Sequence, residues 1–403
     1  MYQGKDGRNI RKDPHESAIL QPGSLRMPLD IDLRKVPVVL LYNLDPSWTS
    51  REKEEVTLLS SQLGHAVSQF GHPTTLVPVS DSDLEATLRP FNPSSHVVFN
   101  WCENLPATPN SESLVAHTLE SLGFVFTGAG ASALTLAQDK QAMKEILGKA
   151  GIPTPAWRLF DRTEAENGWR QFPAIVKAAN EHCSEGLSRD SVVMNRKELN
   201  ARIAYVLETY GPPALVEDFI DGREIHVSLW GNGTIEMLPP VEMDFSQFKD
   251  VHDRLCTYES KFVPGSAHYE GIHTLIPAPL DAEDLHTLNQ VCQAAYRAIG
   301  CRDYGRIDVR IRDGIFHVLD VNPNTDISAD ASMACAAELA GYSYGETGSR
   351  IVRLAVDRHP AWGRGSGDIG SGLPTIEGGE SWEKSSTHPR LKSSGKRGRP
   401  GGP

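Results

Sequence analysis

Apolar and polar positions in the first hundred residues form short strand-like runs separated by longer helix-like stretches. Residues 36–44, 74–79 and 96–101 are apolar runs of strand length, and residues 52–70 have the spacing of an amphipathic helix. Strands that alternate with helices are typical of a parallel sheet of the α/β class. We therefore expect a first domain with a parallel sheet at residues 35–130.

The pattern changes after about residue 130, where helices no longer separate every pair of strands. Two prolines in the turn GIPTPAW, at 151–157, prevent the preceding helix from continuing. The helices are expected at 132–150, 196–210, 281–299 and 330–341, and the strands at 173–179, 214–220, 223–230, 234–239 and within 305–322. This region is therefore α+β, and we divide it into a small subdomain, 131–214, and a large one, 215–357.

The two ends of the chain carry no such pattern. Residues 1–34 are polar and residues 358–403 are rich in Gly, Ser and Pro, so neither offers enough apolar surface to offset the entropy of ordering. We expect a disordered extension and a disordered tail. Arg397–Pro400 resembles the core of an AT-hook, which would bind DNA, and an ordinary solvated basic end is the alternative.

Composition narrows the class of protein. Apolar residues make up 39% and charged residues 23% of the 403 positions, as in soluble globular proteins, and the net charge of −12 disfavours nucleic-acid binding by the folded part. No apolar run has the length of a membrane span, and the N-terminus lacks the apolar centre of a signal peptide. The six cysteines lack zinc-site spacing. We expect a cytoplasmic protein with no membrane partner.

Acidic and amide side chains gather in the segment GRIDVRIRDGIFHVLDVNPN, at 305–324. Side chains alternate between the faces of a strand, so Arg306 and Asp308 share one face of the first strand, and Asp320 and Asn322 share one face of the second. A three-residue loop, 312–314, would pair Ile311 with Ile315 and keep the polar faces together. A two-residue turn would put the two aspartates on opposite faces.

On the three-residue register, Asp308, Asp320 and Asn322 converge beside Arg306. Oxygen ligands of this kind suit Mg²⁺, and an arginine can stabilise a phosphoryl group in transfer. The alternative is an ordinary surface network of ion pairs.

A phosphate site also needs cations from elsewhere in the chain. Lys140 stands at a helix start, Lys177 ends an apolar strand before the small-residue loop NEHCSEGLS, and Lys261 stands in YESKF. Carboxylates at Glu217 and Glu224 could accept hydrogen bonds from an adenine amino group and ribose hydroxyls. The alternative for each of these residues is an ordinary charged side chain on the solvent-exposed surface, with no role in binding. His226, His273 and His317 are most simply explained as packed strand residues.

Together these motifs resemble the D-alanine:D-alanine ligase branch of the ATP-grasp enzymes. The resemblance rests on AQDKQAMKEILGKAGIPTPAW, AIVKAANEHCSEGLS, LVEDFIDGREIHV, YESKF and the 305–324 hairpin, in the family's order and at similar spacing. It covers about residues 130–345. The resemblance implies an ATP-grasp fold behind an N-terminal Rossmann-like domain, and an ATP-dependent ligase that forms a C–N bond through an acyl phosphate.

The resemblance also implies roles for the candidate residues. ATP would lie between two antiparallel sheets, its base read by Glu217, its ribose by Glu224, and its phosphates held by lysines and the 184–186 loop. Mg²⁺, with Mn²⁺ as the alternative ion, would bind as a pair of ions, and Arg306 and Lys261 would serve catalysis. The ATP residues implied are Lys140, Lys177, Ser184, Gly186, Glu217, Glu224 and Lys261, and the metal ligands are Asp308, Asp320 and Asn322. The family's members are often homodimers.

Departures from the family concern the substrate. Family members usually carry glutamate at Asp320, and a serine and a tyrosine at Cys183 and Phe262. Glu52, Glu54 and Glu55 are candidates to replace the glutamate that holds the first substrate's amino group. Asp326 stands where those ligases have glycine before the pocket for the second carboxylate, which it would repel.

We therefore expect small carboxylate and amine substrates other than two D-alanines. A D-alanine:D-alanine or depsipeptide ligase proper, and a non-catalytic ATP-binding regulatory protein, are the alternatives.

Overall fold

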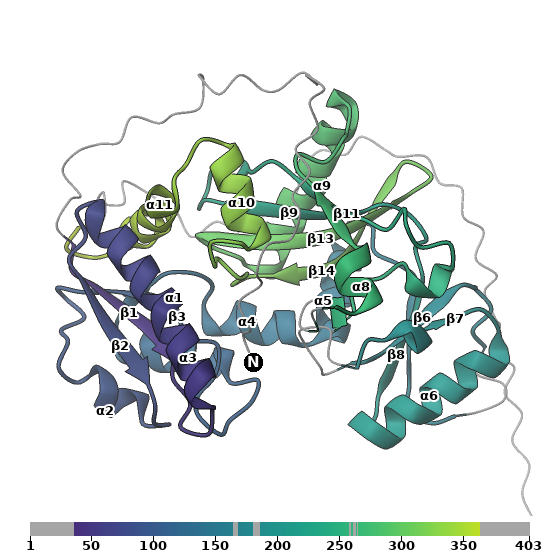
Figure 1. The fold of residues 1–403 in the computed structure, drawn as a ribbon, viewed down its shortest axis with the longest axis horizontal. Helices are drawn as coiled ribbons and strands as arrows, with labels where there is room; N and C mark the ends of the chain where they lie inside the picture. The colour runs from purple at the N-terminus through teal and green to yellow at the C-terminus, as the bar shows by residue number, and fades with distance from the viewer. Residues whose placement is uncertain are drawn as a thin grey trace, which may run out of the picture. The chain divides into compact units, whose positions relative to one another are not determined.

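The computed structural model describes residues 36–362 except 164–167, 180–185, 258, 261–262 and 264. Within these residues the chain forms three sheets, each packed with its own helices (Figure 1). The expected extension 1–34 and the AT-hook-like tail lie outside the described residues. No helix in the described part has both the length and the apolar character needed to cross a membrane.

The N-terminal sheet is parallel throughout, with the strand order β2-β1-β3-β4. The predicted α/β sheet is therefore confirmed. Its strands and helices are β1 (Val38–Asn43), α1 (Ser50–Gln69), β2 (Thr74–Val79), α2 (Leu84–Leu88), β3 (Val97–Trp101), α3 (Glu112–Ser121) and β4 (Val125–Phe126). Buried apolar side chains fill both faces of β1, where Val38 and Leu40 pack with one cluster and Val39 and Leu41 with another.

The last helix of the described chain returns to this sheet. α10 (Ser332–Leu339) and α11 (Tyr344–Val356) follow the large sheet in sequence, but α11 packs on α1 through Ile351 and Val352 (Figure 1). Two glycines allow this approach. A Cβ at Gly348 would lie 2.7 Å from Val67 Cγ2, and one at Gly345 would lie 2.6 Å from Phe70 Cε2.

Two short helices link the first sheet to the rest, where the sequence predicts one helix at 132–150. α4 (Ala131–Gln138) ends and α5 (Lys140–Lys149) begins at Asp139, whose backbone is extended (φ −92°, ψ 95°). The Asp139 side chain accepts a hydrogen bond from Ala142 N and caps α5. The single-helix prediction is thus wrong, because a good N-cap residue restarts the helix immediately before Lys140.

The small sheet is antiparallel, with the order β5-β8-β6-β7, and α6 (Arg196–Tyr210) packs its apolar side chains against it. Its strands are β5 (Trp157–Phe160), β6 (Ala174–Ala178), β7 (Val192–Val193) and β8 (Ala214–Asp218). A short 3-10 helix, η2 (Arg189–Ser191), precedes β7.

The large sheet is also antiparallel, with the order β12-β11-β9-β13-β14 and β10 paired to β9. α9 (Ala282–Ile299) packs on one face through Leu288, Cys292 and Tyr296. The strands are β9 (Glu224–Trp230), β10 (Glu236–Met237), β11 (Val241–Asp244), β12 (His273–Leu275), β13 (Tyr304–Arg312) and β14 (Ile315–Asn322), with η3 (Val251–Asp253) and α8 (Ala267–Gly271) between them. The opposite face of β9, β13 and β14 carries the polar side chains described next.

Candidate functional site

The turn between β13 and β14 has two residues, so the three-residue loop predicted from the sequence is wrong. Asp313 and Gly314 have positive φ values of 54° and 73°, and Arg312 pairs with Ile315. An Asp-Gly pair with both residues in the left-handed region is the favoured two-residue hairpin turn. Such a turn, taken alone, would separate the two aspartates.

A β-bulge brings the aspartates back to one face. The register shifts between Asp308 and Val309, where Val309 pairs with Val318 and Asp308 pairs with Asp320, leaving Leu319 as the extra residue. Asp308 therefore lies directly opposite Asp320, and Arg306 opposite Asn322. Asp308, Asp320 and Asn322 lie on one face beside Arg306, as predicted, but the cross-strand pairs differ, because the three-residue loop would have placed Arg306 opposite Asp320.

Asp308 is the centre of a hydrogen-bonded group. Arg306 donates to it from Nε at 2.6 Å and from Nη2 at 2.9 Å, and Asn322 Nδ2 donates to Asp308 Oδ2 at 3.1 Å. Burial, which alone raises the pKa of Asp308, is outweighed by Arg306 and His226, and the pKa is lowered. Asp308 is thus held as a carboxylate.

Asp320 has a different environment. Its Oδ1 accepts a hydrogen bond from Val321 N at 3.0 Å. Burial raises its pKa and Asp308 adds to the rise, while Lys140, Lys177 and Lys144 oppose it. Two facing carboxylates and the amide oxygen of Asn322 are hard oxygen donors on adjacent strands, so the residues present fit a divalent cation of the Mg²⁺ type.

Lys177 and Glu217 meet on neighbouring strands of the small sheet. Lys177 Nζ lies 2.7 Å from Glu217 Oε2, and Lys144 Nζ lies 2.6 Å from Glu217 Oε1. Burial alone would raise the pKa of Glu217, but the two lysines outweigh it and the pKa falls to about 2. The structure therefore brings together two residues predicted for ATP, Lys177 and Glu217, and adds a third that the sequence analysis missed.

Lys144, the missed residue, joins the two antiparallel sheets. Its side chain is 1% exposed and also donates to Thr154 Oγ1 at 2.8 Å and to the carbonyl of Leu319, the bulge residue, at 3.1 Å. Thr154 in turn donates to the Val318 carbonyl at 2.9 Å. The side chains of Lys144 and Thr154 thus donate hydrogen bonds to backbone carbonyls of the edge strand β14 at the bulge. The only sequence signal for Lys144 was its position one helical turn after Lys140.

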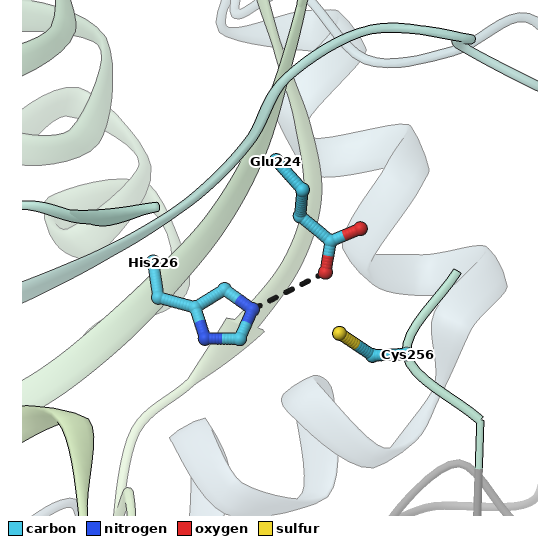
Figure 2. A group of neighbouring side chains, drawn as sticks. All are labelled: Glu224, His226 and Cys256. Carbon is cyan, nitrogen blue, oxygen red and sulfur yellow. Dashed lines mark hydrogen bonds and ion pairs between the residues drawn. The ribbon is translucent and has the colours of Figure 1, made fainter. Parts of the chain in front are cut away.

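Glu224 is engaged by two partners. Arg310 Nε donates to Glu224 Oε2 at 2.8 Å, and His226 Nε2 lies 3.2 Å from Glu224 Oε1 (Figure 2). Burial alone would raise the pKa of Glu224, but Arg310 and His226 outweigh it and the pKa is lowered well below its usual range. Arg310 was also missed, since a strand arginine three residues from a turn gives no sign of burial.

Glu224, His226 and Cys256 form a group whose donor atoms lie within 4.8 Å of one another (Figure 2). A soft cation is the ion that such a mixed set would hold. Arg310 Nε and His226 Nε2 already contact the two carboxylate oxygens of Glu224, so hydrogen bonding within the protein explains this group without a metal. We therefore assign no metal here, and His226 is a buried hydrogen-bonded residue, as its strand position suggested.

Of the loop predicted to cover the phosphates, Gly186 is described. Its φ is 70°, and its carbonyl accepts a hydrogen bond from Arg202 Nη2 at 2.5 Å. A Cβ at this position would lie 2.8 Å from the Tyr210 ring, so the close approach also requires glycine. Gly186 itself is therefore held by its hydrogen bond from Arg202 and by its contact with Tyr210. Ser184, Cys183, Lys261 and Phe262 lie outside the described residues.

Lys140 and Asp326 flank the hairpin. Lys140 is the first residue of α5, and its charge opposes the rise in the pKa of Asp320 that burial causes. Asp326 Oδ1 accepts hydrogen bonds from Ser328 N at 2.8 Å and Ser328 Oγ at 2.7 Å, a local turn. Burial raises the pKa of Asp326.

Glu52 does not fit the proposed substrate role. Its carboxylate accepts hydrogen bonds from Thr49 N and Thr49 Oγ1, both at 2.8 Å, and so forms the capping box of α1. Glu54 is exposed on the same helix. The capping motif could have been read from the sequence, since Thr49 precedes Glu52 by three residues.

Comparison with known proteins identifies the family of this chain. The family model described as D-ala D-ala ligase C-terminus matches residues 146–353. The chain belongs to the D-alanine–D-alanine ligase family. A D-alanine–D-alanine ligase of Desulforudis audaxviator is 32% identical over 252 residues, which cover 61% of this chain and 78% of that protein. The uncharacterized protein y4sG of Sinorhizobium fredii is 32% identical over 301 residues, 73% of this chain and 86% of that protein.

Solved structures support the fold. The crystal structure of D-alanine–D-alanine ligase from Bacillus anthracis complexed with ATP superposes with a TM-score of 0.61 at 21% identity, covering 79% of this chain and 97% of that one. The predicted ATP-grasp fold is confirmed. Family membership also confirms the predicted enzyme class, an ATP-dependent ligase that forms a C–N bond.

Proposed function

We propose that this protein is an ATP- and Mg²⁺-dependent ligase that joins a small carboxylate to an amine through an acyl phosphate, on substrates other than two D-alanines. The observation that carries this proposal is the bulged hairpin, where Asp308 faces Asp320 and Arg306 faces Asn322. An arrangement that needs a bulge to bring four polar side chains to one face is unlike an accidental surface network.

The residues have distinct roles in this proposal. Asp308, Asp320 and Asn322 would hold the divalent ion, which when bound neutralises phosphate charge. Arg306, already paired with Asp308 and within 3.3 Å of Thr325 Oγ1, is positioned to stabilise charge on the transferring phosphoryl group. Lys177 and Lys140 would contact the phosphates, and Lys261, which lies outside the described residues, stays a prediction for the γ-phosphate.

The proposed reaction consists of two successive displacement steps. The substrate carboxylate oxygen attacks the γ-phosphorus and ADP leaves. The amine nitrogen then attacks the acyl carbon, inorganic phosphate leaves, and the nitrogen loses a proton. The conversion of ATP to ADP and inorganic phosphate thus drives formation of the C–N bond.

The substrate is expected to differ from that of the relatives named D-alanine–D-alanine ligase. Asp326 is partly buried and interacts electrostatically with Arg306, and a second substrate that brings an α-carboxylate to this loop would meet the charge of Asp326. Asp320 also has a shorter side chain than the glutamate that the resemblance implies. An amine without a carboxylate next to it avoids the repulsion.

Phosphate release from Mg-ATP tests the proposal. The purified protein is assayed with pairs drawn from amino acids of both configurations, other carboxylates and amines, with D-alanine as one member of the panel. We expect release that requires both an acid and an amine and that Asp308→Asn abolishes. Turnover with D-alanine alone would identify a D-alanine–D-alanine ligase proper, and ATP binding without turnover on any pair would identify a regulatory ATP-binding protein.

A further inference from the structure

The short segment that follows β14 connects two parts of the candidate site. Asn322, a predicted metal ligand, is the last residue of β14, and Thr325 Oγ1 accepts a hydrogen bond from Arg306 Nη1 at 3.3 Å. Pro323 directly follows Asn322, and a proline ring fixes φ at about −65°. Whatever holds the middle of this segment therefore constrains both of its ends.

Asn324, in the middle of the segment, uses its side-chain amide on two partners that are distant in the sequence. Its Oδ1 accepts a hydrogen bond from Ala129 N at 2.8 Å, and its Nδ2 donates to Glu112 Oε1 at 2.9 Å. The partners precede Asn324 by 195 and 212 positions. An amide offers an acceptor and a donor together, whereas a carboxylate offers acceptors alone. Asparagine therefore fits both partners at once.

The backbone approaches Asn324 closely at Gly128, in the turn between β4 and α4. A Cβ at Gly128 would lie 2.3 Å from Asn324 Oδ1, and the φ of Gly128 is 86°. Glycine is required here both for the space and for the left-handed backbone. The contact with Asn324 is thus part of how this turn is built.

The turn 127–130 is itself held by the segment that leads into β13. Gly128 N donates to Asp303 Oδ2 at 2.9 Å, and Arg302 Nε donates to the Gly128 carbonyl at 2.6 Å. The side chain of Asp303 is fully buried. Buried hydrogen bonds to a charged group hold their partners more firmly than exposed ones. The turn is therefore a fixed support for Asn324.

Glu112, the first residue of α3, is the second support. Burial and then the charge of Glu103 raise the pKa of Glu112 to about 8, and the hydrogen bond from Asn324 opposes this rise. The charge of Glu112 in turn raises the pKa values of buried Tyr304 and Cys102. Among these neighbours, Asn324 is the one that favours the ionised carboxylate.

We propose that Asn324 is a positioning residue for phosphoryl transfer, which keeps the segment 322–325 in place through Glu112 and Ala129. That segment in turn holds the guanidinium of Arg306 and the predicted metal ligand Asn322. A misplacement of about 1 Å in an active site can cost about 100-fold in rate, so the two hydrogen bonds of one amide can matter. This inference rests on the proposed ligase activity.

A charged substitution tests the hydrogen bond between Asn324 and Glu112. Asn324→Asp keeps the acceptor for Ala129 N, but at about pH 9 it sets two ionised carboxylates against each other. With the acid and amine that give the most ADP in wild type, we expect kcat to fall at least about tenfold. The KM for ATP should change less than about twofold, because the predicted ATP residues lie on other elements.

Exchanging the donor and the acceptor should rescue this variant. In Glu112→Gln the new amide can still accept from Asn324, so its own loss in kcat should be less than about threefold. In the double variant the same amide can donate to the introduced carboxylate, and kcat should return to within about threefold of Glu112→Gln alone. Two independent structural defects would add instead of cancelling. No recovery in the double variant would overturn the proposal.

The pH profile is a second readout. As the pH falls below about 8, a proton shared by the two carboxyl groups restores a hydrogen bond in Asn324→Asp, so its kcat relative to wild type should rise. Asn110→Asp is the matched control, since it adds the same charge at an exposed position whose φ of 57° aspartate tolerates. A ratio that stays constant with pH, or an equal loss in the control, would overturn the proposal.

Binding of Mn²⁺ tests the inference without catalysis. The probe is Mn²⁺ titrated into the full-length protein saturated with ADP, with the bound ion measured by electron paramagnetic resonance. Asn324→Ala releases the segment that carries Asn322, so Mn²⁺ should bind at least about tenfold more weakly than to wild type. Asn110→Gly, which also removes an amide, should bind Mn²⁺ as wild type does. An unchanged Mn²⁺ affinity in Asn324→Ala would overturn the proposal.

These measurements separate the inference from the proposed function. ADP formation by wild type that the Asn324 substitutions leave unchanged would overturn the inference and leave the ligase activity intact. Weaker Mn²⁺ binding in Asn324→Ala, with no ADP formed by wild type on any substrate pair, would support the positioning of Asn322 and contradict the proposed function.

Discussion

Lys144 Nζ lies 2.6 Å from Glu217 Oε1, and the two side chains are 1% and 2% exposed. The pair joins α5 to the small sheet, and through Leu319 the same lysine reaches the bulge of the large sheet. A buried ion pair costs desolvation when it forms, but removing one partner leaves the other buried and uncompensated.

Lys144→Met should therefore lower the free energy of unfolding by about 3 kcal/mol. Lys149→Met is the matched control on the same helix. Lys149 is 76% exposed and lies 3.7 Å from Glu145, so its loss should change stability by less than about 0.5 kcal/mol. Urea unfolding measures both. A loss in Lys144→Met no larger than that in the control would contradict the structural role of this pair.

Asp320→Asn should reduce kcat at least about 100-fold, because it removes a charged ligand from the metal-binding face while preserving the shape of the side chain. The half-saturating Mg²⁺ concentration should also rise. Asp313→Asn is the control on the same hairpin, since asparagine tolerates the positive φ of that turn position. Steady-state kinetics with varied Mg²⁺ measures both variants, and equal kinetics for the two would exclude Asp320 from the metal site.

Glu112→Gln should change the pH dependence of stability. Because the pKa of Glu112 is raised from 4.5 to about 8 in the folded state, the stability that its protonated form contributes is fully present below pH 4.5 and is lost as the pH rises toward 8. The variant does not ionise, so its stability relative to wild type should increase from pH 5 to pH 8, by at most about 1.4 kcal/mol per unit. The free energies of unfolding of both proteins are measured with urea at each pH. A difference between variant and wild type that stays constant over this range would show that Glu112 ionises normally.

Glu224→Gln should raise the KM for ATP about tenfold if this carboxylate binds ribose hydroxyls as predicted. The same substitution should add less than about twofold for 2′,3′-dideoxy-ATP, which lacks both hydroxyls. Because Arg310 depends on Glu224, stability is measured in parallel. An equal KM increase for both nucleotides would assign Glu224 to holding Arg310 and not to binding ribose.

The sequence predicted most of the elements because their patterns are local. Short apolar runs located β1 and β3, and in the hairpin of β13 and β14 the positions of Asp308 and Asp320 followed from the alternation of side chains along a strand. The hairpin register was not predictable by the same arithmetic, because a bulge is a single extra residue that leaves no periodic signal. The wrong turn and the missed bulge each shift the register by one residue in the same direction, and a total shift of two residues keeps the same side chains on one face.

Lys144 and Arg310 were not predicted as site residues for a different reason. Lys144 and Arg310 are charged residues that sequence reasoning places on the surface, and their burial depends on partners far along the chain, at Glu217 and Glu224.

The central claim is that a carboxylate is activated by phosphorylation, and trapping with hydroxylamine tests it most directly. Hydroxylamine replaces the unidentified amine, so each acid of the panel is incubated with Mg-ATP and hydroxylamine, and the hydroxamate is identified by mass and compared with ADP formed. We predict one or more acids that give hydroxamate and ADP in equal amounts, with no product from Asp320→Asn. ATP binding with no hydroxamate from any acid would contradict the account.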